Sequence, residues 1–406
     1  MTYEVLLGDC IESMKKLPAE SVDMCVTSPP YYSLRDYGND KQIGLEATLG
    51  GYIDNMVKVF EEVRRILKPE GTLWLNLGDS YNGSGGAGGD YNKGGLKEGQ
   101  PKYPGRNEPT LKRKDLMGVP WRVAFALQEA GWYLRQDIIW AKPNCMPEPV
   151  KDRCTKSHEY LFMFAKQEKY YYDNQAIKEP IGEAMLNMIS KGSQGEHDES
   201  HYKHNKGSSK GNTRQTPNRM MSSQETLDSI SSGRNKRSVW TVSPKPYKGA
   251  HFAVFPPELI EPCILAGTSA KGCCSKCGLG WVREMQNSGG PNTEARITEV
   301  MERTGLNRKA ASSYSVSGSA WKKHKRENPD IMLGWKPTCE CDAEVVPAVV
   351  LDPFGGSGTT AGVAVKHGRN AILCELNEEY AALIPSRVES ITQIPKEVLN
   401  DKREWI

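Results

Sequence analysis

Runs of apolar residues alternate with helix-spaced apolar residues through the first 80 positions of the chain. The apolar runs that predict buried strands are residues 5–7, 22–26 and 72–77. Residues 10–17 predict a short helix, and residues 52–67 predict a longer one because their apolar side chains recur three and four positions apart. Alternating strands and helices predict an α/β fold with a doubly wound, mostly parallel sheet.

Two further segments have the pattern of a folded core. The first contains a predicted helix at residues 120–130 and predicted strands at residues 132–140 and 160–164. The second, residues 346–389, has the pattern of a strand–turn–helix–strand–helix unit. Long stretches between these segments are rich in polar residues and glycine, so we interpret them as polar insertions into one core.

Composition narrows the class of protein without naming a ligand. The 406 residues carry a formal net charge of +3, which by itself gives no argument for nucleic acid. No apolar run approaches the ~18 residues of a membrane span, and the first residues lack the features of a signal peptide. We therefore expect a cytoplasmic protein whose 11 cysteines are reduced thiols or metal ligands.

A glycine-rich turn follows an apolar strand predicted at residues 348–351. Asp352 ends that strand, and three glycines follow before a predicted helix. Glycine lets the backbone turn sharply and approach a ligand, and amides at the start of a helix point toward that ligand. The next predicted strand ends in Glu375, where a carboxylate can bind ribose hydroxyls. The turn predicts a nucleotide-type cofactor, although it lacks both the dinucleotide spacing and the P-loop lysine.

A proline turn follows the second predicted strand. Pro29 and Pro30 fix the backbone, and Ser28 is held extended before them. One reaction that such a turn suits is methylation of the amino group of an aromatic base. That amino group is a poor nucleophile, because its lone pair is delocalised into the ring. The Ser28 hydroxyl and the Pro29 carbonyl can grip its hydrogens and free the lone pair for a methyl sulfonium, while Tyr31 can stack on the flipped base. These four residues are the predicted catalytic set.

Four cysteines fall into two close pairs within one polar insertion. The pairs are Cys274 with Cys277, and Cys339 with Cys341. Four thiolates can close a tetrahedral structural zinc site, and Gly278 suits the tight turn of a zinc knuckle. Cys273 is an extra candidate ligand. The pairs predict a structural zinc ribbon, with reduced, unliganded thiols as the alternative.

The glycine turn and the proline turn together resemble those of the amino-methylating DNA methyltransferases in permuted order, the beta class. In that class a Ser/Asp-Pro-Pro-Tyr segment comes early and an Asp-Pro-Phe-x-Gly-x-Gly segment comes late, as residues 28–31 and 352–358 do here. The resemblance implies a circularly permuted, Rossmann-like sheet of seven strands, S-adenosylmethionine as cofactor, and a flipped base in double-stranded DNA. It leaves room for a homodimer and a cognate restriction enzyme, in a bacterial, archaeal or phage-infected cell.

The resemblance also assigns residues and segments. The implied cofactor contacts are Asp9, Cys10, Ser28, Phe255, Asp352, Phe354, Gly355, Gly356, Ser357, Gly358, Thr359 and Glu375. The implied order is a catalytic part at 1–173, a target-recognition insertion at 174–247, a cofactor-side helix at 248–271, a zinc-ribbon-like insertion at 272–345 and a cofactor-binding part at 346–406. The expected DNA contacts, suited to phosphate and guanine, are Arg214, Arg219, Arg234 and Arg237.

The target base and its alternatives are interpreted from the proline turn. Ser28 in place of Asp resembles enzymes that methylate cytosine N4, so cytosine is favoured over adenine N6. Cytosine C5 is disfavoured, because it needs a cysteine after proline in the catalytic loop and Pro262-Cys263 lies in a predicted helix. RNA or a protein glutamine is an alternative substrate, and Ser in place of Asn argues against glutamine. A non-catalytic zinc-ribbon DNA-binding module is a further alternative, against which both intact motifs argue.

Overall fold

The computed structural model divides into two compact units. One consists of Met1–Ile177, Arg237–Val282 and Trp335–Ile406, and the other of Lys178–Lys236 and Arg283–Gly334. The structure describes residues 2–34, 37, 39, 41–83, 108–145, 147–148, 150–180, 234–245, 254–286, 297–298, 301–302, 305, 308 and 331–394. In the second unit, Glu179 pairs with Arg234 through the backbone and forms ion pairs with Arg234 and Lys236. The five-part division inferred from the sequence stays a prediction.

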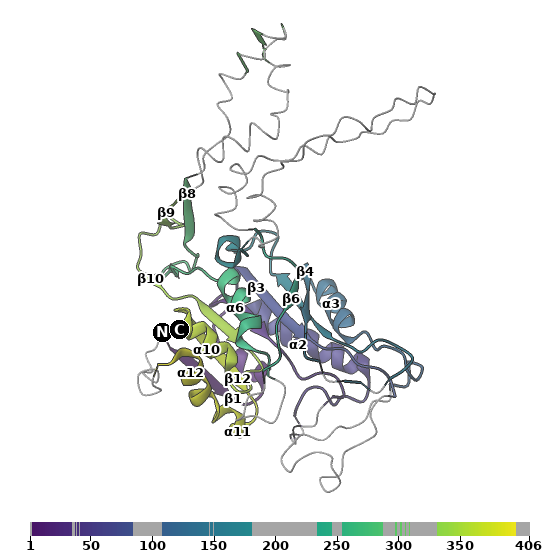
Figure 1. Ribbon diagram of the computed structural model, residues 1–406. Helices are drawn as coiled ribbons and strands as arrows, with labels where there is room; N and C mark the ends of the chain where they lie inside the picture. Colours follow the sequence, from purple (N-terminus) through teal and green to yellow (C-terminus); the bar gives the residue numbers. More distant parts are fainter. Residues whose placement is uncertain are drawn as a thin grey trace, which may run out of the picture. The chain divides into compact units, whose positions relative to one another are not determined.

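An eight-stranded sheet forms the centre of the first unit (Figure 1). Its strands in spatial order are β1 (Tyr3–Leu7), β12 (Asn370–Glu375), β11 (Val349–Asp352), β2 (Val22–Thr27), β3 (Leu67–Leu77), β5 (His158–Ala165), β4 (Tyr133–Ala141) and β6 (Val239–Thr241). Within this sheet, β5 alone runs antiparallel to its neighbours. The predicted α/β class is confirmed. The expected count of seven strands was wrong, because residues 239–241 pair with β4 and add an edge strand.

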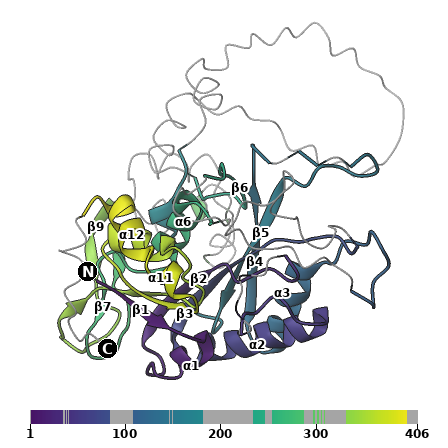
Figure 2. The ribbon, with the colours of Figure 1, turned by 90° about the horizontal axis from the view of Figure 1, so that it is seen from below.

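Helices cover both faces of this sheet (Figure 1 and Figure 2). One face packs against α1 (Cys10–Met14), α2 (Leu49–Ile66) and α3 (Val119–Glu129), and the other against α6 (Pro257–Gly267), α10 (Thr359–Lys366) and α12 (Ile384–Thr392). The shorter elements are η1 (Asn174–Ile177), β7 (Cys273–Cys274), β8 (Val282–Gln286), β9 (Ile331–Lys336), β10 (Val345–Val346) and α11 (Glu378–Ala381). Among the described helices, none is both long enough and apolar enough to cross a membrane.

Helix α2 shows how the hydrophobic pattern produces the local structure. The Thr48 hydroxyl accepts a hydrogen bond from the Gly51 amide at 3.1 Å and caps the helix. The side chains buried along one stripe are Leu49, Tyr52, Met56, Val59, Phe60, Val63 and Ile66. Burying each large apolar side chain contributes about 1.5–3 kcal/mol. The helix ends at Ile66, and β3 begins at Leu67, five residues earlier than predicted, because a bulge in the β2–β3 pairing accommodates the segment.

The strand order reverses between β11 and β2. From β11 the chain crosses through α10 to β12 on one side, whereas from β2 it crosses through α2 to β3 on the other. In doubly wound sheets such a reversal opens a crevice at the carboxyl ends of the strands, and ligands bind there. Ser28 directly follows β2, and Asp352 is the last residue of β11. The fold therefore brings the two sequence motifs to the same crevice.

Candidate active site

A buried carboxylate joins the two motifs. Asp352 is 1% exposed, and its carboxylate accepts hydrogen bonds from the hydroxyls of Thr27 and Thr360, each at 2.6 Å. The Phe354 amide adds a third bond at 3.1 Å. Burial raises the pKa of Asp352, and the three donors oppose that shift. Asp352 therefore fixes the end of β2, the glycine turn and the first turn of α10 relative to one another.

The glycine turn has a backbone that other residues rarely adopt. Gly356 and Gly358 have φ values of +52° and +86°. A Cβ on Gly358 would also lie 2.7 Å from Ile384 Cγ2, so α12 packs directly on this turn. The Ser357 hydroxyl is buried and has no hydrogen-bond partner among the described residues. The turn thus presents an unsatisfied hydroxyl and the amino end of α10 at one place.

Glu375, the last residue of β12, is held by backbone amides. Its Oε2 accepts a hydrogen bond from the Gly356 amide at 2.7 Å, and its Oε1 accepts one from the Asn377 amide at 2.8 Å. Burial raises the pKa of Glu375, and these amides oppose the shift. Each carboxylate oxygen can accept a further bond, so the fixed side chain can still receive the predicted ribose hydroxyls.

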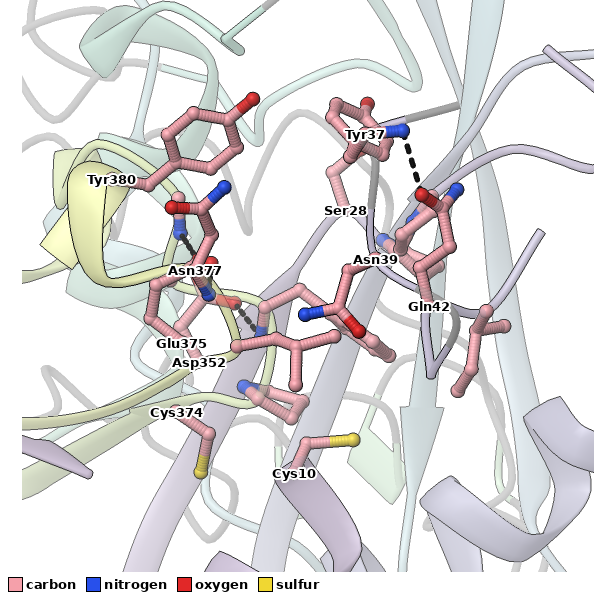
Figure 3. Close-up of a pocket in the computed structure, with 18 of the residues that line it drawn as sticks. Cys10, Ser28, Tyr37, Asn39, Gln42, Asp352, Cys374, Glu375, Asn377 and Tyr380 are labelled. Carbon is pink, nitrogen blue, oxygen red and sulfur yellow. Dashed lines mark hydrogen bonds between the residues drawn. The ribbon is translucent and has the colours of Figure 1, made fainter. Parts of the chain in front are cut away.

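One pocket at the crevice contains nearly all of the predicted residues (Figure 3). Those that line it are Asp9, Cys10, Ser28, Pro29, Pro30, Tyr31, Phe255, Asp352, Phe354, Gly355, Gly356, Ser357, Thr359 and Glu375. Gly358 is absent from this lining and packs against Ile384 instead. Lys41 is the one basic residue among the described lining residues, against three carboxylates. The pocket therefore favours a ligand with positive groups over one with phosphates.

A loop that the sequence did not single out forms one wall of the pocket. Tyr37, Asn39 and Gln42 lie across the cavity from Asn377 and Tyr380 (Figure 3). The Tyr37 amide donates to the Gln42 side chain at 2.6 Å, and the Tyr37 ring meets the Tyr380 ring edge-on, with centroids 6.3 Å apart. Turn contacts position these residues, so no hydrophobic period marks them in the sequence.

The predicted catalytic residues Ser28 and Tyr31 are connected to a charged pair. The Ser28 hydroxyl donates to the Tyr31 hydroxyl at 3.4 Å, which in turn donates to Glu159 at 2.8 Å. Glu159 also accepts a bond from Asn76 Nδ2 at 3.3 Å and forms an ion pair with Lys142. Burial, and then the Glu159 carboxylate, raise the pKa of Tyr31 well above its usual value. The phenol therefore stays protonated and remains a donor.

Packing fixes the proline turn from two further directions. A Cβ on Gly78 would lie only 2.5 Å from Cε2 of Tyr31, so the ring occupies the space that a side chain would need. The Tyr52 hydroxyl donates to the Pro30 carbonyl at 2.9 Å. With the Pro30 carbonyl engaged in this way, the Pro29 carbonyl and the Ser28 hydroxyl are the neighbouring acceptors at the pocket.

Asn76, Glu159 and Lys142 were missed by the sequence analysis. Asn76 lies on β3, Glu159 on β5, and Lys142 directly after β4. Only the pairing of these three strands places the side chains beside Tyr31. A weak signal was available, because Asn76 and Glu159 are polar residues within predicted or neighbouring apolar strands.

Comparison with protein families shows which family the chain belongs to. The family model described as DNA methylase, of the N6 and N4 type, matches residues 22–274 and 346–385, more than half of the chain. The chain belongs to this DNA methylase family. This family agrees with the class of enzyme predicted from the sequence, a methyltransferase that acts on an exocyclic amino group of a DNA base.

The methylase is also similar to individual proteins. Type II methyltransferase M.SmaI of Serratia marcescens is 35% identical over 388 residues, which cover 95% of this chain and 90% of the relative. Type II methyltransferase M.XycI of Xanthomonas campestris pv. cyanopsidis is 45% identical over 268 residues, or 64% of this chain and 71% of the relative. The solved PvuII DNA methyltransferase (cytosine-N4-specific) is 18% identical, with a TM-score of 0.48, over 99% of this chain and 94% of that structure.

The pocket of the methylase fits S-adenosylmethionine, the methyl donor expected for this family. The carboxylate of Glu375 suits ribose hydroxyls, and the rings of Phe354 and Phe255 provide apolar surface for an adenine. The Ser357 hydroxyl lacks a partner among the described residues and can bond a polar group of the methionine part. The excess of carboxylates suits a sulfonium and an ammonium, which carry positive charge.

The expected DNA contacts of the methylase stay predictions. Arg214 and Arg219 lie outside the described residues. Arg234 is paired with Glu179, its Nε lying 3.4 Å from the carboxylate. The Arg237 carbonyl accepts a bond from Trp240 Nε1 at 2.6 Å just before β6. The ion pair engages the Arg234 side chain within the protein, whereas the bond at Arg237 involves only its backbone.

Proposed function

We propose that this methylase transfers a methyl group from S-adenosylmethionine to N4 of a flipped cytosine in double-stranded DNA. The observation that carries the proposal is the place of the Ser28 hydroxyl, which lines the pocket and lies 3.4 Å from the Tyr31 hydroxyl. Tyr31 in turn donates to Glu159, so the Ser28 oxygen has lone pairs that can accept a hydrogen bond from an incoming donor. An amino group is such a donor. The preference for cytosine over adenine rests on the serine that stands where adenine enzymes more often have aspartate.

The residues of the proline turn activate the amino nitrogen. Bound S-adenosylmethionine supplies an electrophilic methyl group on a sulfonium. Ser28 Oγ and the Pro29 carbonyl accept the two amino hydrogens, which favours a tetrahedral nitrogen whose lone pair points to the methyl carbon. As the N–C bond forms and the S–C bond breaks, positive charge develops on the nitrogen, and the Glu159 carboxylate behind Tyr31 stabilises it. The surplus proton leaves the nitrogen on the Ser28 side, toward solvent.

Methylation at cytosine C5 would use a cysteine that follows a proline, and in this chain that cysteine does not reach the pocket. Cys263, the cysteine that comes after a proline, is fully buried within α6, and its thiol donates to the Leu259 carbonyl at 3.6 Å. It is not among the residues that line the pocket. Transfer to an amino group needs no covalent bond between protein and base, which agrees with the hydrogen-bonding groups found at Ser28.

Mass spectrometry of nucleosides tests this proposal. Unmethylated genomic DNA is incubated with the methylase and isotope-labelled S-adenosylmethionine, then digested completely. Labelled N4-methylcytosine is the expected product, and a Ser28→Ala variant should form it about 10²–10³-fold more slowly. Labelled N6-methyladenine would agree with the family and the mechanism but would show that the target base is adenine and not cytosine. Labelled 5-methylcytosine, or label in RNA or protein but not in DNA, would overturn the proposal as a whole.

A further inference from the structure

Four thiols converge on one point in the first unit, away from the cofactor pocket. The Sγ atoms of Cys274, Cys277, Cys339 and Cys341 all lie within 4.8 Å of one another, and all four cysteines are free. A zinc ion with four thiolates at about 2.3 Å sets sulfur–sulfur separations of about 3.8 Å by tetrahedral geometry. The four sulfurs therefore need only a small contraction to surround one ion.

The backbone of the first pair forms a tight turn that aims two sulfurs at the same point. The Gly278 amide donates to the Cys274 carbonyl at 2.9 Å, and the Cys274 amide donates to the Leu279 carbonyl at 2.9 Å. Gly278 has a φ of +74°, which favours glycine. Backbone bonds close the turn, and the amides of Lys276 and Cys277 also point to the Cys274 sulfur, an arrangement that suits a thiolate ligand.

A short ladder brings the second pair beside the first. β7, which contains Cys274, pairs antiparallel with β10, and the Ser275 amide donates to the Glu344 carbonyl at 2.9 Å. The ends of residues 278–338 are thereby held together at the cysteines. A metal ion that bridges the two pairs would close this long segment, and closing a long loop lowers the entropy of the unfolded chain.

The neighbouring thiol, Cys273, belongs to the core and not to the cluster. It donates to Asp23 Oδ1 at 3.1 Å. The same carboxylate forms an ion pair with Lys68 at 2.8 Å and accepts the Val349 amide at 2.7 Å. Asp23 and Val349 stand near the amino ends of β2 and β11, opposite to the ends that carry the pocket. The cluster is therefore too far along these strands to act on a ligand in the pocket.

We propose that Cys274, Cys277, Cys339 and Cys341 bind one zinc ion that is structural. It closes the base of residues 278–338 and fixes that base to the amino ends of β2 and β11 through the adjoining Cys273–Asp23 contact. Lys68 packs against Gly278 and places a positive charge near four thiolates that would leave the bound ion with net negative charge. The family match stops at residue 274 and resumes at 346, so three of the ligands lie outside the matched segments.

Metal analysis of the full chain tests the proposal. The protein is purified without chelator and measured by inductively coupled plasma mass spectrometry. We expect about one zinc per chain in the wild type, and almost none in the Cys277→Ser/Cys341→Ser double variant. Cys154→Ser, at an exposed cysteine outside the cluster, and Cys273→Ser are the matched controls, and both should retain the wild-type content.

Cobalt exchange gives a readout that does not depend on the variants folding. Wild-type protein in which Co²⁺ replaces the metal should show the thiolate charge-transfer and tetrahedral bands of a four-sulfur site. Removal of the metal should lower the melting temperature, and Zn²⁺ but not Mg²⁺ should restore it. Wild type without zinc, iron in place of zinc, an octahedral cobalt spectrum, or zinc loss in Cys273→Ser equal to that of the double variant would each overturn the proposal.

Discussion

A carboxylate joins the strands β2 and β11 at each end, buried at Asp352 and partly buried at Asp23, and the cofactor pocket lies at the carboxyl ends. At the carboxyl ends, Asp352 bonds the Thr27 hydroxyl. At the amino ends, Asp23 accepts the Val349 amide and pairs with Lys68. The same type of side chain makes the same type of connection between the same two strands. These carboxylate contacts between the strands therefore do not explain why the ligand site lies at the carboxyl ends.

The difference lies in the segments that adjoin each end of the two strands. Beyond Asp352 the chain makes the glycine turn and enters α10, whose first amides point back to the crevice. The amino ends instead receive the β7–β10 ladder, whose Cys273 fills the space beside Asp23. In a parallel sheet every helix begins near the carboxyl ends of the strands, so free amides gather there. The opposite edge is available for structural contacts such as the proposed zinc site.

The largest expected effect is loss of chemistry at the carboxyl end. Ser28→Ala removes an acceptor that grips the amino group only as the reaction proceeds, so we expect kcat to fall about 10²–10³-fold. Because Ser28 is one of many residues that line the pocket, the Kd for S-adenosylmethionine should change less than about threefold, well under 1.4 kcal/mol. Single-turnover transfer of labelled methyl and calorimetric titration measure the two quantities.

Ser21→Ala is the matched control for this variant. The Ser21 hydroxyl bonds the Pro18 carbonyl in an exposed turn before β2, away from the pocket. Its kcat should equal that of the wild type. If Ser28→Ala kept more than half of the wild-type rate at saturating cofactor, the role assigned to the serine oxygen would be wrong.

The next largest effect is on cofactor affinity. Glu375→Gln keeps the size of the side chain and loses its charge, and a hydrogen bond to a charged group is worth about 1.5–3 kcal/mol. We expect the Kd for S-adenosylmethionine to rise about 10–100-fold, with kcat at saturation nearly unchanged. A fall in kcat without a change in Kd would contradict the ribose-binding role.

The pH dependence of binding sharpens this prediction. Burial raises the pKa of Glu375, so its carboxylate gains a proton at a higher pH than an exposed glutamate does. Wild-type affinity should therefore decrease on acidification before the pH reaches the usual glutamate value of about 4.3. Glu375→Gln should show a flatter profile over the same range, measured by titration at a series of pH values.

The two motifs were predictable because each is a continuous run of residues. The glycine turn and the proline turn each come directly after an apolar strand, so local pattern alone indicated their place at strand ends. Their meeting at β2 and β11 agrees with the general behaviour of parallel sheets. The four cysteines were equally visible, because each pair is close in sequence.

The rest of the site depends on pairing between distant segments. Glu159 is a charged residue at the start of β5, next to the predicted strand at 160–164, and alone it resembles a solvated strand end. The register that pairs Trp140 with Glu159 and Leu77 with Tyr160 brings it beside Tyr31. β6 escaped prediction for a related reason, because its three residues are too few to show a period.

A smaller effect is expected from the group behind Tyr31. Glu159→Gln keeps an acceptor for the Tyr31 hydroxyl but removes the negative charge, and it leaves Lys142 without its partner. We expect kcat to fall about tenfold, which corresponds to about 1.4 kcal/mol of transition-state stabilisation. Comparison with Tyr31→Phe identifies the cause. If the negative charge of Glu159 acts through the Tyr31 hydroxyl, the Glu159→Gln/Tyr31→Phe double variant should be no slower than the slower of the two single variants.

The smallest functional effect is expected at the amino end, and it tests the comparison directly. Asp23→Ala removes the carboxylate that holds Val349, Lys68 and Cys273, so we expect the free energy of unfolding to fall by about 1–3 kcal/mol. The Kd for S-adenosylmethionine should stay within about twofold of the wild type, less than 0.5 kcal/mol. Thermal unfolding and calorimetry measure these on the same preparation.

The matched change at the other end is Asp352→Asn. It keeps the shape of the side chain, but its amide NH₂ group replaces one of the two oxygens that accept bonds from Thr27 and Thr360. One of these hydroxyls would then face another donor in place of an acceptor. This variant should weaken cofactor binding and also lower the free energy of unfolding, because the Asp352 contacts position the glycine turn. If Asp23→Ala weakened cofactor binding as much as Asp352→Asn, the two ends of the strand pair would be coupled. The amino end would then act on the pocket through the strands, and the division between a structural and a ligand-binding edge would not hold.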